Sequence, residues 1–308
     1  MTTTTLSDLP DAQPISPAPT TATRPFYWSV RRELWENRSI YIAPLAAGCL
    51  AFCGFIISTI GLPERRRAVL LLNDVAQQRA RIEWPYDMVA MMLMFTSFVV
   101  GVFYCLDALH GERRDRSILF WKSLPVSDLT TVLSKLSIPL VVLPLLTFAI
   151  IVVTQTLMWL WTAVLLLLNG LPLTTSAQLP LIPSWLVLLY GFIAIKLWHA
   201  PFYAWLLLVS GWARRATFLW AALPILAIAA LEAMAFQSRY FLDFVKYRLF
   251  GGMSKAFAFN PHEKHPTVDF HQLTPGEYLT TPGLWLGLIF AAAVVVGVVH
   301  LRRSRGPL

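Results

Sequence analysis

Residues 110–135 read HGERRDRSILFWKSLPVSDLTTVLSK, a polar block between two long apolar runs. The run before it, residues 88–106, is dominated by Met, Leu, Val and Phe, and residues 136–168 form the longest apolar run in the chain. Apolar runs of this length predict membrane-spanning helices, because about 20 helical residues cross the hydrocarbon core. The block mixes both charge signs with Phe120 and Trp121, which favours an amphipathic segment that a partner contacts at the membrane surface over a simple tether.

The composition of the whole chain is typical of a membrane protein. Of its 308 residues 56% are hydrophobic and 14% are charged, and the mean hydropathy is +0.59. Soluble domains carry about a quarter charged residues. Each span is expected to be a helix, since lipid leaves open backbone groups without partners, and the runs lack the in/out alternation of barrel strands. The predicted fold is therefore an all-α polytopic membrane protein with six transmembrane helices, at about 40–61, 86–107, 137–165, 184–209, 216–236 and 283–301.

Basic residues at the ends of the spans predict the orientation of the chain. Cytoplasmic loops carry an excess of Lys and Arg, and placing both termini inside puts more of these residues, in shorter segments, on the cytoplasmic side. We therefore expect a multi-pass protein of the bacterial inner membrane with both termini cytoplasmic. The net charge of +8 arises mainly at these borders, so membrane lipid, and no nucleic acid, is the expected partner of the basic residues.

The segments outside the spans differ in character. Residues 1–23, rich in Thr, Pro, Ser and Ala, predict a disordered cytoplasmic tail, which leaves residues 24–308 as one membrane domain. Residues 24–39, RPFYWSVRRELWENRS, place aromatic and charged side chains on roughly opposite faces and predict an interfacial amphipathic helix. Residues 62–85 predict a helix between two prolines. The larger external loop, 237–282, predicts a surface helix that Gly251 and Gly252 end.

Sequence motifs for chemistry on the chain itself are absent. The sequence contains no G-x-x-x-x-G-K-[ST] loop for nucleotide phosphates, no G-x-S-x-G and no H-E-x-x-H. His262, His265 and His271 match no standard metal spacing, and neighbouring prolines break any helix that would align them. We therefore expect a chain that is not an enzyme and has no catalytic residue, metal or cofactor of its own.

Four ionisable residues inside the predicted spans are candidates for function, because charge within lipid is costly. They are Asp107, Lys196, His199 and Glu232. Lys196 and His199 share a helix face at i, i+3, and Glu232 in the fifth span is a plausible ion-pair partner of Lys196. A buried pair that holds two helices in register and a substrate contact explain these residues equally well.

The block after the second span resembles the cytoplasmic coupling region of type-2 ABC exporter permeases. The shared features are an acidic residue at the span end, E-R-x-x-x-[ST], a turn with P-[VIL]-S and a Lys that opens the next span. They are carried by Asp107, Glu112, Arg113, Ser117, Pro125, Val126, Ser127 and Lys135. A second stretch, residues 196–224, is similar to the same family in its P-x-x-x-W-x-x-x-x-S-x-W-A-R-R run, with Pro201, Trp205, Ser210, Trp212, Ala213, Arg214 and Arg215. Together with the six spans and the large loop before the last one, the resemblance covers nearly the whole chain after residue 24.

This resemblance implies a permease of the type V exporter fold that forms the translocation path as a homodimer. ATP and Mg would be bound by a separate ABC-type ATPase subunit. Residues 110–128 would form the coupling helix, with Ile118, Phe120 and Trp121 in a groove of the ATPase. The residues assigned to ATPase coupling are Glu112, Arg113, Arg114, Asp115, Arg116, Ser117, Phe120, Trp121 and Lys122, with a second contact at Trp212, Arg214 and Arg215. Pro125 would end this helix, and Ser127 or Asp128 would cap the next one.

Other interpretations of the sequence remain open. The block is also compatible with an ordinary charged loop that obeys the positive-inside rule. A six-span chain can serve as a non-transporting sensor or scaffold of a cell-envelope complex, and a lipid-modifying membrane enzyme would need an interfacial acid/base or metal constellation. If the chain exports a substrate, its 12 Trp and 19 Phe favour an apolar or amphipathic cargo over a sugar, although aromatic belts at the interfaces explain many of them equally well.

Overall fold

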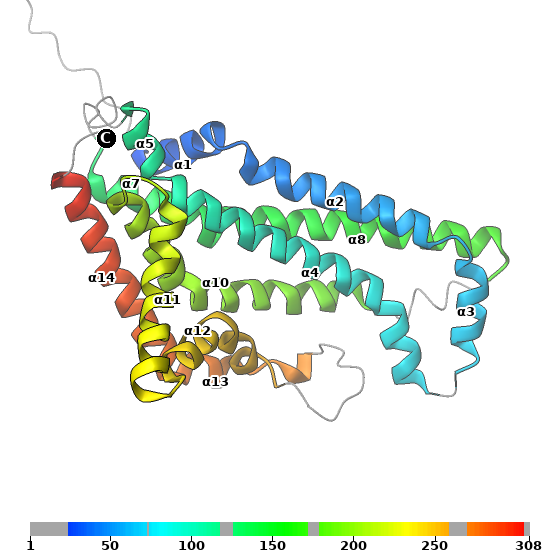
Figure 1. Ribbon diagram of the computed structural model, residues 1–308. Coiled ribbons are helices and arrows are strands. Elements are labelled where there is room, and N and C mark those ends of the chain that lie inside the picture. The colour runs from blue at the N-terminus through cyan, green and yellow to red at the C-terminus, as the bar shows by residue number, and fades with distance from the viewer. Residues whose placement is uncertain (1–23, 73, 118–125, 172–178, 259–269, 305–308) are drawn as a thin grey trace, which may run out of the picture.

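The computed structural model describes residues 24–72, 74–117, 126–171, 179–258 and 270–304, which form helices and their connecting turns (Figure 1). Within these ranges there is no strand, and Phe257 and Leu273 form an isolated bridge. Six of the described helices are long and apolar enough to cross a membrane: Ser39–Ser58, Gln77–Arg114, Asp128–Leu168, Leu181–Trp212, Thr217–Phe236 and Pro282–Ser304. They overlap the six predicted spans one by one, so the prediction of an all-α chain with six apolar helices is confirmed.

The helices follow the order of the chain as α1 (Pro25–Glu36), α2 (Ser39–Ser58), α3 (Leu62–Leu70), α4 (Val75–Asp107), α5 (His110–Arg114), α7 (Asp128–Ser137), the π-helical turn η1 (Ile138–Val142), α8 (Leu143–Leu168), α10 (Leu181–Trp212), α11 (Thr217–Phe236), α12 (Tyr240–Ala256), the 3-10 turn η2 (Phe270–Gln272), α13 (Pro275–Thr280) and α14 (Pro282–Ser304). The third span consists of α7, η1 and α8 in direct succession. Pro139 and Pro144 lie in and just after the π-helical turn. Because a proline has no backbone N–H, it loosens the regular helical ladder at this point.

Packing between helices follows from the apolar character of the spans. α10 packs along α14. Three further helices, α2, α4 and α8, pack on one another, and α4 also contacts α10. Many large apolar side chains on the outside of this bundle remain exposed, with Leu50 at 71% and Leu168 at 78%. Such exposure is unfavourable in water but not in hydrocarbon, so the outer surface of the bundle suits lipid.

The first and last described helices meet at one end of the bundle. α1, α5, α7 and the C-terminal end of α14 gather there, whereas α3 and the beginning of α4 lie at the opposite end (Figure 1). Six crossings return a chain to the side on which it started. The two motif regions found in the sequence also belong to this end, which we call the coupling end after the family region that the sequence resembles.

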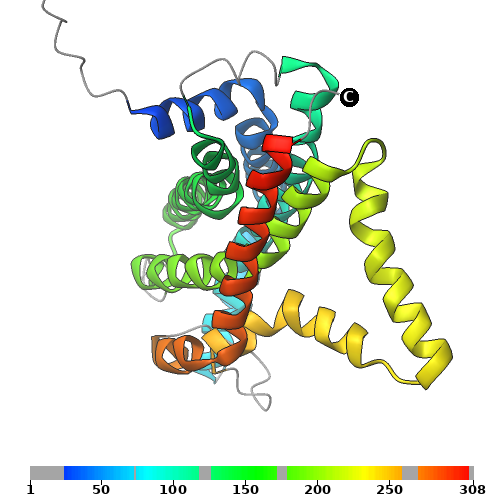
Figure 2. The ribbon, with the colours of Figure 1, turned by 90° about the vertical axis from the view of Figure 1, so that its left-hand side faces the viewer.

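α11 stands apart from the other spans. Figure 2 shows it separated from the bundle, with α12 running back from its far end toward the other helices. Ala221 is the one buried residue of α11, whereas α8 has ten buried residues. Phe218, Leu226 and Leu231 are among its exposed apolar side chains. A helix that is apolar all round and touches little protein must be covered by lipid or by another subunit.

Two predictions about the segments between spans are wrong. Residues 62–85 do not form one helix that ends before a proline, because α3 ends at Leu70 and α4 begins at Val75 and continues through Pro85. Gly251 and Gly252 do not end α12, which continues to Ala256. A Cβ on Gly252 would lie 2.6 Å from Trp198 Cγ, so this glycine serves close packing of α12 on α10 rather than helix termination. The predicted tail, residues 1–23, lies outside the described residues.

Candidate functional site

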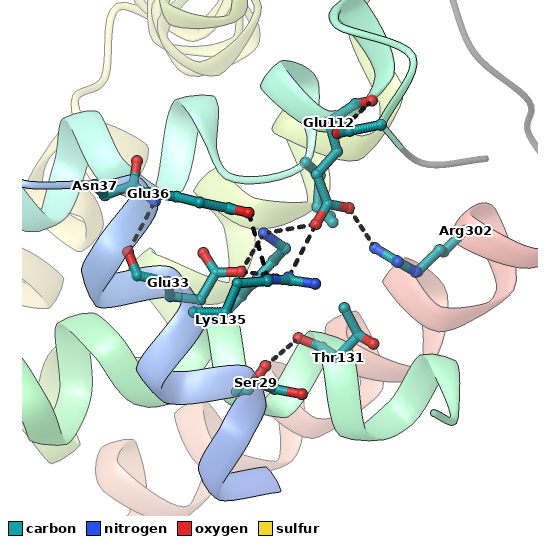
Figure 3. Close-up of polar contacts among 12 residues, drawn as sticks. Ser29, Glu33, Glu36, Asn37, Glu112, Thr131, Lys135 and Arg302 are labelled. Carbon is teal, nitrogen blue, oxygen red and sulfur yellow. Dashed lines mark hydrogen bonds and ion pairs between the residues drawn. The ribbon is translucent and has the colours of Figure 1, made fainter. Parts of the chain in front are cut away.

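Buried charged side chains join α1, α5 and α7 at the coupling end (Figure 3). Glu33 of α1 is fully buried, and Glu112 of α5 and Lys135 of α7 are 7% and 1% exposed. Lys135 Nζ lies 2.8 Å from Glu33 Oε1 and 3.1 Å from Glu112 Oε1, so one ammonium group bridges two carboxylates. The hydroxyl of Tyr104 in α4 donates a 2.8 Å hydrogen bond to Glu33 Oε2, which brings the second span into the same contact.

Two arginines and a third carboxylate complete this group. Arg302, in the last turn of α14, donates from Nη1 to Glu112 Oε2 at 2.7 Å and from Nε to Asp128 Oδ1 at 2.9 Å. Arg32 Nη2 lies 2.7 Å from Glu33 Oε1 and 3.2 Å from Glu112 Oε1. We call the six residues Arg32, Glu33, Glu112, Asp128, Lys135 and Arg302 the ionic cluster. Its three carboxylates balance its three cations, as buried charges require.

The charges within the ionic cluster keep Glu33 ionised. Burial alone would raise the pKa of this carboxyl, but the charges and hydrogen bonds of Lys135 and Arg32 outweigh burial and lower its pKa. Burial likewise opposes the charge of Arg32, yet the neighbouring carboxylates raise the pKa of its guanidinium. Breaking a buried ion pair by removing one partner leaves an uncompensated charge and is strongly destabilising. The ionic cluster therefore constrains how α1, α5, α7 and α14 meet.

Local sequence explains how α7 presents its two charges. Ser127 has an extended backbone conformation, and its Oγ accepts a 3.0 Å hydrogen bond from the backbone N–H of Thr130. This capping starts the helix at Asp128, as predicted. Asp128 and Lys135 are two turns apart on one face of α7, so both reach the ionic cluster.

A second set of contacts joins the segment after α4 to the end of α10. Ser210 Oγ is fully buried and accepts hydrogen bonds from the backbone N–H groups of Leu109 and His110, both at 3.0 Å. Arg113 Nη1 donates to the carbonyl oxygen of Gly211 at 2.8 Å. The two segments that carry the motifs of the sequence analysis, about 100 positions apart, are thus in direct contact.

The predicted coupling residues occupy different positions at this end. Glu112 and Arg113 are buried and bond to charges and carbonyl groups of the chain itself, so they are not exposed for the ATPase contact that the resemblance implies. Their short helix places them against α10 and α14, whose polar groups replace water. Ser117 is half-buried, and its Oγ is 3.4 Å from the carbonyl oxygen of Glu112. Exposed residues are Arg114, Asp115, Arg116, Trp212, Arg214 and Arg215, whereas Ile118, Phe120, Trp121, Lys122 and Pro125 lie outside the described residues.

The exposed residues form what we call the coupling surface: Arg114, Asp115, Arg116, Trp212, Arg214 and Arg215. Arg114 Nε lies 3.1 Å from Asp115 Oδ1, an exposed ion pair of little energetic weight. The indole rings of Trp212 and Trp220 meet edge to face with centroids 4.9 Å apart, which holds one aromatic side chain at the turn between α10 and α11. Arginine and tryptophan are the residue types that most often dominate protein interfaces.

The four ionisable residues of the spans do not come together. Glu232 accepts hydrogen bonds from the backbone N–H groups of Tyr240 and Phe241, both at 2.8 Å, and so caps the beginning of α12. Lys196 Nζ instead donates to the Tyr203 hydroxyl at 3.2 Å. The predicted Lys196–Glu232 ion pair is therefore wrong, because α11 diverges from α10 and the start of α12 satisfies the Glu232 carboxylate.

The other two ionisable residues have separate surroundings. The ring nitrogens of His199 lie 2.8 Å from the carbonyl oxygen of Ile195 and 2.9 Å from that of Leu249, which links α10 to α12. Asp107 is exposed at the end of α4. Among the described residues, no three His, Cys, Asp or Glu side chains are placed to hold a metal ion. His262 and His265 lie outside these residues, and His271 is exposed in η2.

The sequence analysis did not assign Arg32, Glu33 or Arg302 to the site, and it named Asp128 only as a helix cap and Lys135 only as part of a motif. It placed aromatic and charged side chains on roughly opposite faces of an interfacial helix at residues 24–39, whereas Ser29 and Glu33 are the buried residues of α1. Their i, i+4 spacing was a signal that they share a face, but Lys135, which neutralises Glu33 together with the adjacent Arg32, comes from a helix 102 positions away. Local patterns do not contain that pairing.

Function is inferred from the residues themselves, because no protein-family model, no curated protein and no solved structure matches the chain.

Proposed function

We propose that this chain is the membrane-spanning permease subunit of an ATP-driven ABC exporter. The observation that carries the proposal is the contact between the two motif segments. Leu109, His110 and Arg113 bond to Ser210 and Gly211 at one end of the bundle. Both segments resemble parts of the same family that contact the ATPase, and a shared ATPase contact requires them to lie side by side.

The ionic cluster supports this proposal, because it would transmit a displacement of α5 to other helices. α5 contributes Arg114 to the coupling surface and also contacts the ends of three spans. Glu112 pairs with Lys135, which leads into the third span, and with Arg302, which ends the sixth, and His110 bonds to Ser210 near the end of α10. A displacement of α5 by an ATPase would shift the buried carboxylate of Glu112 against its cations. Because separating these charges is costly, the attached helices would move with α5.

A homodimer is the expected assembly of the permease, and α11 supports it. The isolated position of α11 (Figure 2) leaves most of its large apolar side chains exposed, and α11 of a second copy has the chemistry to cover them. In this proposal the coupling end faces the cytoplasm, where ATP and Mg bind to the partner ATPase, and the chain itself holds no cofactor.

The test of the proposal is a tagged pull-down from native membranes in mild detergent, with identification of partners and an ATPase assay. We expect a stoichiometric ATPase with Walker motifs and vanadate-sensitive turnover. The double variant Arg214→Glu/Arg215→Glu should lose this partner, whereas Arg67→Glu, an exposed charge reversal in α3 at the opposite end of the bundle, should retain it. Purification without any ATPase would overturn the proposal and favour the sensor or scaffold interpretation.

The dimer is tested separately by cross-linking single cysteines in a background that lacks Cys49, Cys53 and Cys105. Leu226→Cys in α11 should give a cross-linked dimer in membranes. Val153→Cys in α8, similarly apolar and 58% exposed, is the matched control and should not. Equal cross-linking at both positions would contradict a specific interface at α11.

A further inference from the structure

The orientation of α1 is the reverse of that of an amphipathic helix in a soluble protein. Its buried residues are polar, Ser29 and Glu33. Its large aromatic side chains point outward, with Trp28 at 55% and Trp35 at 65% exposed. A helix with this arrangement is stable only where its outer surface meets something other than bulk water.

Arg31 lies between the two outward tryptophans. Its guanidinium carbon is 5.2 Å from the centroid of the Trp28 ring and 4.7 Å from that of the Trp35 ring. We call Trp28, Arg31 and Trp35 the indole face. Both carboxylates of α1 lie near Arg32, with Glu33 at 2.7 Å and Glu36 at 3.8 Å. Arg31 forms no ion pair with any described residue, so the charge of the indole face is not neutralised within that part of the chain.

We propose that the indole face binds the phosphate of an anionic phospholipid headgroup at the coupling end. Tryptophan side chains settle at the level of the headgroups, and a guanidinium offers a planar pair of donors that matches the oxygens of a phosphate. The two indoles hold the guanidinium in place, so little conformational freedom is lost on binding. Exposed Arg24 and Arg38 at the two ends of α1 add to the positive charge of this surface.

Lipid bound at the indole face acts on the ionic cluster through α1. Arg31 and Arg32 are adjacent. The indole face lies on the outer side of α1, and Glu33 lies on the inner side, where it contacts Lys135. Anchoring α1 to the membrane surface therefore disfavours withdrawal of Glu33 from the cluster. Membrane charge thus stabilises the coupling end, whether or not an ATPase is the partner of that end.

The experiment uses the purified full chain in neutral detergent micelles. Phosphatidylglycerol is titrated into the micelles while thermal unfolding is followed, and native mass spectrometry counts retained lipids. We expect phosphatidylglycerol to raise the unfolding midpoint and to be retained, and phosphatidylcholine at the same concentration to do neither. Inorganic phosphate should have no effect, and an equal shift with phosphate would overturn the lipid proposal in favour of a free-anion site.

Matched variants separate the indole face from general surface charge. Arg38→Gln removes one exposed cation from the same surface and should weaken apparent phosphatidylglycerol affinity by about fivefold at most, the effect of one basic residue near an anionic surface. Arg31→Gln should weaken this affinity at least tenfold. Trp35→Leu keeps the charge of the surface and should weaken the affinity more than Arg38→Gln does. Equal losses in Arg31→Gln and Arg38→Gln, or an unchanged Trp35→Leu, would overturn the proposal. Trp35 and Arg38 are exposed, and half-buried Arg31 forms no ion pair with any described residue, so unfolding midpoints without lipid should match the unmodified chain.

Discussion

Lys135 Nζ lies 2.8 Å from Glu33 Oε1, although the two residues are 102 positions apart and both are almost completely buried. The pair joins a helix that precedes the first span to the helix that opens the third. Glu112 shares the same ammonium at 3.1 Å, which places the segment after the second span in this contact. None of these helices can separate from the others without exposing a charge to an apolar environment or leaving one unpaired.

Replacing Lys135 by Met should destabilise the chain by about 3–5 kcal/mol, because it leaves two buried carboxylates without their shared cation. The measurement is the free energy of unfolding of the purified chain in detergent. Lys246→Met in α12 is the control: its side chain is 63% exposed and 3.9 Å from Asp243, so a change below about 0.5 kcal/mol is expected. Similar losses in the two variants would show that the ionic cluster has no special role.

The stability of the chain should depend on pH in the acid range through Glu33. Its pKa in the folded chain is lowered from the ordinary value of 4.5 by Lys135 and Arg32, against the effect of burial. A lowered pKa contributes stability that is fully present above pH 4.5 and is lost as the pH falls through the folded value. The free energy of unfolding, measured from pH 7 downward, should therefore decrease below that point.

The matched variant for this pH dependence is Glu33→Gln, which cannot ionise. It should be less stable than the unmodified chain at pH 7, and the difference between them should shrink as the pH falls below the ordinary pKa of a glutamate. A difference that stays constant over this range would mean that Glu33 does not titrate with a lowered pKa.

Replacing Ser210 by Ala should loosen the segment after α4 from the end of α10. The substitution removes the acceptor of two backbone N–H groups, those of Leu109 and His110, and a buried donor left without a partner costs about 1–3 kcal/mol. Faster amide hydrogen exchange at residues 109–114 is the expected result. Ser254→Ala, at an exposed serine in α12, is the control and should leave exchange in that segment unchanged.

Glu232 and Lys196 should act independently of one another. Glu232→Ala removes the acceptor at the start of α12 and should destabilise the chain, as the loss of a helix cap does. In a double-mutant cycle with Lys196→Met, the two changes should be additive within about 0.5 kcal/mol. A coupling energy well above that limit would indicate an ion pair between Glu232 and Lys196, which the structure does not contain.

Much of the fold could be predicted because hydropathy acts locally. A run such as residues 136–168 must be helical in lipid whatever its neighbours are, and Ser127 caps α7 through groups within three residues of it. Boundaries outside lipid were less predictable. Pro85 and Gly252 are read from sequence as helix ends, yet each lies inside a helix, because a long helix tolerates a proline and close packing on Trp198 requires a glycine.

The sequence alone determined the number and helical type of the apolar spans and located the two polar segments that meet at one end of the bundle. Only the tertiary structure decided which charges meet. The buried side of α1 carries Glu33 because Lys135 and Arg32 neutralise it there, and Glu232 caps α12 rather than pairing with Lys196 because α11 diverges from α10. Burial of an apolar run depends on the run itself, whereas burial of a charge depends on a partner that the fold brings from elsewhere in the chain.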